Sequence, residues 1–268
     1  MTRTVDDVNV GSLLRGWRKL RGVTQLELAL RADSSARHIS FIETGRSTPS
    51  RSMVLHLAEQ LGVPVRDRNA LLMAAGYAPS YPETSLTAPA MTTLRAGLDQ
   101  LLTAYEPFPA LVMDGMYDVV SANRGVLMLL DGVAAHLLEP PLNAMRLTLH
   151  PQGLAPRIRN LGEWRAHLLE RMDRQATLRS SDALRGLYEE VAAYPAPPGS
   201  TRTGPDGQGP AAHPYALPLR IEAGGRVLSF ISTATTFNTP MDVTVSELAV
   251  ETFLPADPET AAALRAMG

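Results

Sequence analysis

Apolar residues recur at helical spacing along residues 10–75 of this 268-residue chain. In the first stretch, Leu13, Leu14, Trp17 and Leu20 fall on one side of a helix. Glycine, proline and hydroxyl residues interrupt the pattern at intervals. The pattern therefore predicts five short helices, over residues 10–21, 24–31, 35–43, 51–62 and 64–75.

The second predicted helix begins at a capping box. The Thr24 side chain can accept from the backbone of Glu27, while Glu27 bonds back to the backbone of Thr24. The buried face is expected to consist of four apolar residues, Leu26, Leu28, Ala29 and Leu30. The polar run 32–35 then breaks the pattern, and either Ser34 or Ser35 can cap the third helix.

The third predicted helix has little apolar surface. Ile39 and Ile42 are three residues apart and are expected to face the core. The other faces carry small, polar or charged side chains, with Phe41 as the exception. A short helix of this kind is expected to present its outer side to a partner.

The periodicity changes after residue 90. Helices are predicted at 92–105, 123–130, 162–177, 182–193 and 258–266, and strands at 110–114, 117–121, 215–222, 226–237 and 246–254. Two strands, then helices, then three strands predict an α+β domain. We expect an antiparallel sheet of about five strands with helices packed on one face.

Two segments are expected to lack regular structure. Half of the residues in 195–214 are Gly or Pro, which predicts a mobile surface loop. The segment 78–89 is rich in proline and hydroxyl residues, which predicts a linker. The chain is therefore expected to divide into a helical domain over 1–78, a linker over 79–90 and a second domain over 91–268.

The net charge of −2 is unevenly distributed. Residues 1–78 hold 11 Lys or Arg against 7 Asp or Glu, and the remainder holds 14 against 20. A weakly basic helical domain suits a phosphate backbone, whose neutralisation provides salt-dependent affinity. The acidic remainder is expected to avoid nucleic acid.

Composition excludes several kinds of site. The chain has no cysteine, so disulfides, thiolate metal sites and cysteine nucleophiles are excluded. The six histidines show no two-ligand spacing on a common helix face, so we expect no metal and no cofactor. No stretch resembles a signal peptide, and no apolar run approaches the roughly 18 residues that span a bilayer. We therefore expect a cytoplasmic protein without a membrane partner.

The residues around the third predicted helix resemble a known family. The resemblance rests on Gln25, Glu27-Leu28-Ala29, Ile39-Ser40, Ile42-Glu43-Thr44-Gly45-Arg46 and Pro49-Ser50. This set resembles the XRE family of Cro/C1-type helix-turn-helix regulators, from about Leu13 to Gly62. The resemblance implies an all-α, five-helix, lambda-repressor-like domain that binds operator double-stranded DNA. In such domains the second helix of the motif lies in the major groove.

The resemblance also assigns DNA-binding residues. It implies phosphate contacts for Gln25 and Ser35, base-edge contacts for Ala36, Arg37 and Phe41, a place at the groove margin for His38, and a DNA contact for Arg46. A guanidinium can pair with guanine O6 and N7, so Arg37 is the leading base reader.

Two of these assignments have alternatives. Arg37 could be a solvated surface arginine, and Phe41 could be a core residue. Glu43 is expected to be structural, because the family pattern pairs it with an arginine of the first helix, here Arg18. Loss of Glu43 would then unfold the domain rather than change its specificity.

The second domain carries another resemblance. The runs are Glu106 to Ala110, Ser121 to Arg124, Met145 to Leu147, Leu149 to Pro151, Leu228 to Phe230, Thr235 to Phe237, Pro240, Asp242 to Thr244 and Phe253 to Asp257. They resemble the MmyB-type ligand-binding domain, which is typically fused to an XRE reader. The resemblance implies a PAS-like α+β fold that encloses a fatty-acid-like or other amphipathic small molecule. Fold carries over better than ligand identity.

A ligand pocket between sheet and helices would be lined by apolar side chains. The candidates are Leu111, Met113, Leu127, Leu168, Met172, Leu187 and Phe230. The alternative is that all seven are plain core. Arg146 and His150 are four apart and could bind an anionic end of the ligand. Alternatively, Arg146 pairs with an acidic neighbour, His150 caps a turn, and Asn123 closes a turn as well.

The sequence favours a regulator over an enzyme. It has no nucleophile elbow, zinc-binding His-Glu-x-x-His helix, phosphate-binding loop or dinucleotide fingerprint. We expect a non-enzymatic, sequence-specific transcriptional regulator that acts as a homodimer. Its operator affinity would depend on a small ligand. The alternatives are a helix-turn-helix protein-interaction scaffold without a ligand, and an enzyme of unknown class.

Overall fold

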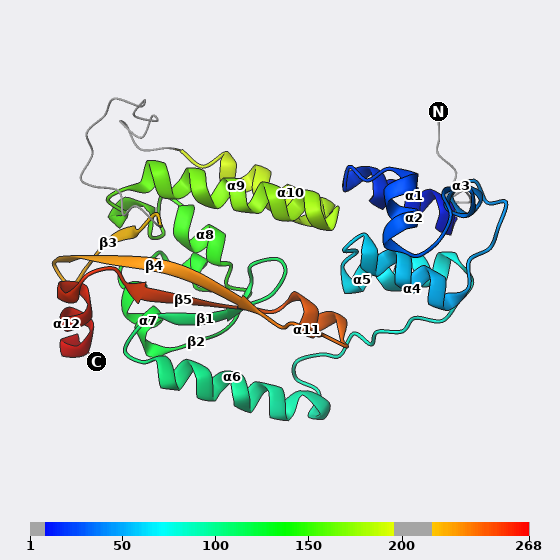
Figure 1. Ribbon diagram of the computed structural model, residues 1–268. Coiled ribbons are helices and arrows are strands. Elements are labelled where there is room, and N and C mark those ends of the chain that lie inside the picture. The colour runs from blue at the N-terminus through cyan, green and yellow to red at the C-terminus, as the bar shows by residue number, and fades with distance from the viewer. Residues whose placement is uncertain (1–8, 196–215, 268) are drawn as a thin grey trace. The chain divides into compact units, whose positions relative to one another are not determined.

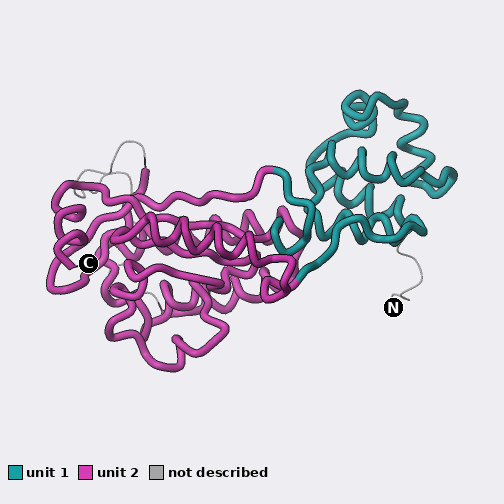
Figure 2. Tube along the Cα trace, turned by 90° about the horizontal axis from the view of Figure 1, so that it is seen from below, with its two compact units in different colours: residues 1–84, 239–246 teal, residues 85–238, 247–268 magenta. Residues whose placement is uncertain are grey.

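A computed structural model describes residues 9–195 and 216–267 (Figure 1). The chain forms two compact units (Figure 2). Unit 1 holds the residues up to Thr84 together with Thr239–Ser246, and unit 2 holds Ser85–Asn238 and the residues from Glu247 onward. The loop predicted over 195–214 lies, apart from its first residue, outside the described residues.

The described part of unit 1 contains the five predicted helices. They are α1 (Val10–Leu20), α2 (Gln25–Arg31), α3 (Ala36–Glu43), α4 (Arg51–Gln60) and α5 (Val65–Ala74). Helix α1 packs closely against α3 at Gly11, where an added Cβ would lie 2.2 Å from the Ile42 carbonyl oxygen. The predicted all-helical domain is confirmed.

The capping predictions for α2 and α3 are confirmed, but one predicted face is wrong. Thr24 and Glu27 form the capping box, and Ser35 rather than Ser34 caps α3. Leu26 and Leu30 are 61% and 74% exposed. Each lies two residues from the buried Leu28, which is about 200° around a helix, so neither can share its face.

The elements of unit 2 follow the predicted order with a few additions. They are η2 (Pro89–Met91), α6 (Thr92–Tyr105), β1 (Ala110–Met113), β2 (Val119–Ala122), α7 (Arg124–Leu129), η3 (Ala135–Leu137), α8 (Ala144–Leu149), η4 (Ala155–Arg157), α9 (Leu161–Arg179), α10 (Asp182–Ala192), β3 (Leu219–Ala223), β4 (Arg226–Thr236), β5 (Ala249–Pro255) and α12 (Pro258–Met267). Helix α11 (Val243–Glu247) connects β4 to β5. Helices α8 and α11 were not predicted.

The sheet of unit 2 has five antiparallel strands in the order β2-β1-β5-β4-β3. The first two strands of the sequence therefore join the last one at the middle of the sheet. This arrangement confirms the predicted α+β fold with an antiparallel, PAS-like sheet.

Helices cover both faces of the sheet, and the prediction of one covered face is wrong. Leu98 and Leu102 of α6 pack on Ala110, Val112 and Val250. Side chains of α8, α9 and α10 pack on the opposite face, within the main core of unit 2. Figure 1 shows α6 and the α9–α10 pair on opposite sides of the strands. Strand β1 is buried at every position because it is enclosed from both sides.

Asn123 joins three segments, as the structural alternative predicted. Its Oδ1 accepts from the backbone N–H of Ala110 at 3.0 Å and of Val126 at 3.3 Å. Its Nδ2 donates to the carbonyls of Leu102 and Phe108. A buried amide with its donors and acceptor in use fixes the start of α7 against α6 and β1.

Candidate functional site

Helix α3 presents one face to the core of unit 1 and the other to solvent. Ile39 and Ile42 are buried at 1% exposure, whereas Arg37 is exposed. The Ser35 hydroxyl accepts from the His38 backbone at 3.1 Å and so fixes the first turn. The helix ends at Glu43, and Gly45 follows with a φ of 72°, in the left-handed region that favours glycine.

Three predicted DNA-binding residues come together on the outer side of α3. The Arg37 guanidinium lies 5.2 Å from the Phe41 ring centroid, and the Arg46 guanidinium lies 5.9 Å from it. Phe41 is half-buried and lies outside the hydrophobic core cluster of unit 1. The core alternative for Phe41 is therefore not realised, because its ring supports two cations at the surface.

The other predicted DNA-binding residues are more enclosed. Ala36 is half-buried and packs against the core of unit 1. His38 is also half-buried, while Ser35 is exposed with its hydroxyl committed to the helix cap. Gln25 donates from its side-chain amide to Glu43 at 2.8 Å. A primary amide has two N–H donors, so one remains after this bond.

Glu43 anchors the base of α3. Arg18 of α1 donates to its two carboxylate oxygens at 2.5 and 2.9 Å, as the family pattern predicted. Burial raises the pKa of Glu43, but the hydrogen bonds from Arg18 and Gln25 outweigh burial and hold that pKa below its ordinary value. A bidentate, nearly buried pair of this kind fixes the orientation of α3.

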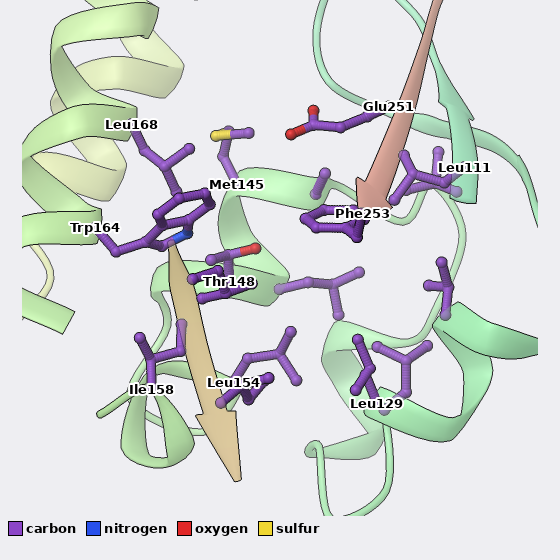
Figure 3. A pocket seen from close by; sticks show the side chains of 17 residues that line it. Leu111, Leu129, Met145, Thr148, Leu154, Ile158, Trp164, Leu168, Glu251 and Phe253 are labelled. Atoms are coloured by element: carbon purple, nitrogen blue, oxygen red, sulfur yellow. The ribbon is translucent and has the colours of Figure 1, made fainter. Parts of the chain in front are cut away.

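Unit 2 contains an apolar pocket with a volume of about 80 Å³ (Figure 3). Its walls come from the face of the sheet opposite α6 and from the helices that cover it. Most of the lining is aliphatic, with Leu111 and Phe253 from strands and Met145, Trp164 and Leu168 from helices α8 and α9. In Figure 3, Glu251 extends toward Met145, at the end of the pocket away from Leu154 and Leu129.

Among the described residues that line the pocket, Glu251 alone is ionisable. Its Oε2 accepts from Nη1 and Nη2 of Arg171 at 3.2 and 3.1 Å. Its Oε1 accepts from Nη1 of Arg171 at 3.2 Å and from the Ser232 hydroxyl at 2.5 Å. Burial opposes the charge of Arg171, yet attraction to Glu251 outweighs burial and raises the pKa of the guanidinium. The carboxylate and the guanidinium therefore form a buried, balanced pair.

The structure places two of the seven predicted apolar residues, Leu111 and Leu168, in the pocket lining. Four others are buried in the main core of unit 2 but do not line the pocket; they are Met113, Met172, Leu187 and Phe230. Leu127 is 58% exposed. Helix α7 is only six residues long and buries Gly125 and Leu129, so Leu127 lies on its outer face.

Arg146 and His150 lie outside the pocket lining, in a surface cluster. Arg146 donates twice to Glu190 at 2.7 Å, and this interaction is the main cause that lowers the pKa of the Glu190 carboxyl to about 2. His150 accepts from the Gln152 backbone and contacts the Tyr194 ring. Both residues therefore follow their structural alternatives, because the opposite side of α8 faces the pocket.

Sequence reasoning missed most of the lining, including Glu251. Helix α8, which supplies Met145 and Thr148, is too short for a visible period. A signal for Glu251 was present, because Ala249, Glu251 and Phe253 alternate along β5 and share one face. An acidic residue in an otherwise apolar stripe marks a buried polar position.

Two features are absent from the described residues. No group of three or more histidine, aspartate or glutamate side chains in them could hold a metal ion. None of the helices they form has the length and hydropathy required to cross a bilayer.

Two family models match the sequence. The model described as the MmyB-like transcription regulator ligand binding domain matches residues 94–267, and a helix-turn-helix model matches residues 14–67. No curated protein matches the sequence significantly. The first model covers most of unit 2, including the residues that line its pocket, and the second contains α3 with its exposed arginine. The chain belongs to the family of XRE-type helix-turn-helix transcription regulators with an MmyB-like ligand-binding domain.

Proposed function

We propose that this regulator reads an operator with α3 and that a small amphipathic molecule in the pocket of unit 2 changes its operator affinity. The observation that carries the DNA-binding part is the Arg37–Phe41–Arg46 cluster on the exposed face of a capped, rigidly anchored helix. The family of the second domain supports the ligand. We infer no catalytic role and place the protein with the DNA, in the cytoplasm.

Within the cluster, Arg37 reads a base and Arg46 binds a phosphate. Arg37 lies in the first turn of α3, whose N-terminal residues contact base edges in helix-turn-helix complexes. Arg46 follows the end of α3, so it is suited to the DNA backbone that borders the groove. The remaining predicted contacts are Gln25 and Ser35 to phosphates, and Ala36, His38 and Phe41 at the groove.

Two copies of the chain act together on a pseudo-palindromic operator. A single module of this size buries about 600–1,000 Å² on DNA, too little for tight specific binding. Two α3 helices in successive major grooves would require half-sites about one helical turn apart. In each copy, the reader would occupy residues 1–78 and the ligand-binding domain residues 91–268, as proposed from the sequence.

The connection between β4 and β5 offers a route from pocket to reader. Asp242 accepts from the backbone N–H of Thr84 at 3.1 Å, and the N–H of Val243 donates to the Pro82 carbonyl at 2.8 Å. Thr239–Ser246 thus belongs to unit 1, although the chain on both sides of it forms the sheet. A ligand that shifts β5 would pull on the segment that leaves α5, provided that it binds two arrangements with different affinity.

Binding-site selection with two variants tests the reading role of Arg37. Arg37→Ala should relax base preference at one position in each half-site, with a loss of roughly 1–3 kcal/mol against the preferred base. Arg37→Lys keeps the charge but cannot form the bidentate pair, so it should lose the same preference while it retains more overall affinity.

Arg95→Ala is the matched control, since Arg95 is an exposed arginine of α6 in the other unit. It removes one positive charge and should leave the selected sites unchanged. If Arg37→Ala selects the same sites as the wild type, Arg37 does not read a base. Circular dichroism of each variant establishes that the fold is retained.

A further inference from the structure

The Phe41 side chain is shared by two arginines of the exposed α3 surface. The guanidinium of Arg37 lies 5.2 Å from its ring centroid, and that of Arg46 lies 5.9 Å from it. Arg37 precedes Phe41 by four residues, which places the two side chains one helical turn apart. The Phe41 carbonyl accepts from the backbone N–H of Arg46 at 2.8 Å and of Ser47 at 3.1 Å. One residue thus holds a cation from the helix and another from the segment that follows it.

The ring is the one printed partner of both guanidinium groups. In the part of the chain that the structure describes, neither Arg37 nor Arg46 donates a side-chain hydrogen bond or pairs with a carboxylate. A guanidinium carries five N–H donors in a fixed planar fork. Within the described residues, the donors of both arginines therefore remain available for a partner molecule.

Arg185 of α10 shows a different way to hold an arginine. Its guanidinium lies 5.4 Å from the Tyr188 ring, and it also donates to the Asp173 carboxylate at 2.5 Å. The carboxylate fixes the orientation of this side chain but occupies donors that a base could otherwise use. Arg185 is therefore held but committed, whereas the described contacts hold Arg37 without commitment.

This difference matters for a residue that reads a base. The attraction between an aromatic ring and a guanidinium acts on the charge and the flat face of the cation and requires none of its N–H donors. The bidentate pair with guanine O6 and N7 uses those donors. A ring can therefore restrict a long side chain before DNA binds, and so lower the entropic cost of binding, without competition with the base.

Resting on the proposed function, we propose that Phe41 is a positioning residue whose ring holds Arg37 ready to read its base. Phe41 then sets base preference through Arg37 rather than through a base contact of its own. A contact between a ring and an exposed cation is weak, so the expected contribution is about two- to fivefold in base preference at each half-site.

Operator competition with Phe41 variants tests this role. The measured quantity is the ratio of two affinities of the full-length protein, for its selected operator and for that operator changed at the position that Arg37 reads. Phe41→Leu keeps an apolar side chain but removes the ring, and should lower this ratio about two- to fivefold for each half-site. Phe41→Tyr keeps the ring and should retain the wild-type ratio. Tyr188→Leu is the matched control, because it removes the ring from the Arg185 contact in the other unit, and it should change nothing.

A double-mutant cycle separates positioning from direct contact. In an Arg37→Ala background, Phe41→Leu should leave base preference across the half-site unchanged, because the side chain that the ring positions is gone. A direct contact of the ring with a base, such as a thymine methyl group, would instead give the same loss in both backgrounds.

Nuclear magnetic resonance of the protein without DNA measures the restraint itself. The Nε–Hε signals of Arg37 and Arg46 should carry a ring-current shift in the wild type and in Phe41→Tyr, and should lose it in Phe41→Leu. Phe41 is half-buried and lies outside the core cluster of unit 1, so these variants should fold. Circular dichroism establishes the fold of each variant, and Phe41→Met replaces Phe41→Leu if the latter unfolds.

Three results would overturn the proposal. They are an unchanged affinity ratio in a folded variant without the ring, an equal loss in both backgrounds of the cycle, and the absence of a ring-current shift in the wild type. Each of them leaves the proposed function standing. Failure of the proposed function has a different signature, because the wild type would then prefer no operator, and the role of Phe41 would fall with it.

Discussion

The Arg18–Glu43 pair shows how one residue contact controls the surface that we propose binds DNA. It connects α1 to the last turn of α3, and the Glu43 side chain is 2% exposed. Removal of one partner of a buried pair leaves the other charge without compensation. The orientation of the exposed face of α3 therefore depends on a nearly buried ion pair.

Glu43→Gln should lower the free energy of unfolding at pH 7 by roughly 3 kcal/mol. The folded-state pKa of Glu43 is below its ordinary value of 4.5, so its stabilisation is complete above that value and is lost as pH falls through the folded pKa. The difference from wild type should therefore narrow below pH 4.5. Urea unfolding at several pH values measures this difference in the free energy of unfolding. The control is Glu59→Gln on the exposed face of α4, which should change stability by less than about 0.5 kcal/mol.

Arg46→Ala should weaken binding to all DNA sequences alike. If Arg46 contacts one phosphate, the slope of log affinity against log salt should fall in magnitude by about 0.9 for each chain bound. Fluorescence anisotropy at several salt concentrations measures the slope. Unchanged slope, or altered base preference at one position, would assign Arg46 a different contact.

Residues whose role follows from a local rule could be predicted from the sequence. Thr24 and Glu27 form their capping box, and Ser35 caps α3, because both depend on spacing alone. The pocket residues depend on which side of each element faces the cavity. The prediction for Leu127 was wrong for that reason, since a six-residue helix gives no reliable phase. Glu251 was missed although it interrupts an apolar stripe of β5.

At the scale of elements, the close packing of α1 on α3 helps to hold α3 in its position. Long elements with a clear period, such as α6 and α9, could be predicted to within a few residues. Helices α8 and α11 have six and five residues and could not, because they cover less than two turns. The β1–β5 and β4–β5 pairings join distant segments and have no local signal.

Gly11→Ala and Gly16→Ala should have opposite effects on stability, although both glycines lie in α1. A Cβ at Gly11 would meet the Ile42 carbonyl at 2.2 Å, so this change should cost about 1–3 kcal/mol. A Cβ at Gly16 would have no neighbour within 4 Å, so the gain in helix propensity should stabilise by about 0.5–1 kcal/mol. Thermal unfolding of both variants measures the two changes in stability. Equal effects would contradict the close approach of α1 and α3.

At the scale of the whole molecule, the proposed ligand response depends on the β4–β5 connection. Its Asp242 holds the segment that leaves unit 1 and also accepts from the N–H groups of Thr244 and Val245. The hydrogen bonds of the Asp242 side chain are therefore the contacts through which we propose that a shift of β5 reaches the reader. Neither the ligand nor the operator is expected to touch it.

Asp242→Ala should reduce the effect of pocket occupancy on operator affinity while it leaves the two separate affinities nearly unchanged. Anisotropy titrations with and without a saturating concentration of a short amphipathic probe such as pentanoate measure this coupling. Asp257→Ala is the matched control, because Asp257 accepts in the same way from the Thr260 N–H at the start of α12. If Asp242→Ala retains the full ligand effect, the signal takes another route.

The central claim, that this chain recognises a specific operator through α3, is tested most directly by competition binding. Full-length protein is titrated onto a fragment recovered by binding-site selection, with scrambled duplex as competitor, at several salt concentrations. The account predicts a preference of about 10³-fold or more for the selected fragment and a steep loss of affinity with salt. Equal affinity for the fragment and the scrambled duplex at every salt concentration would contradict it.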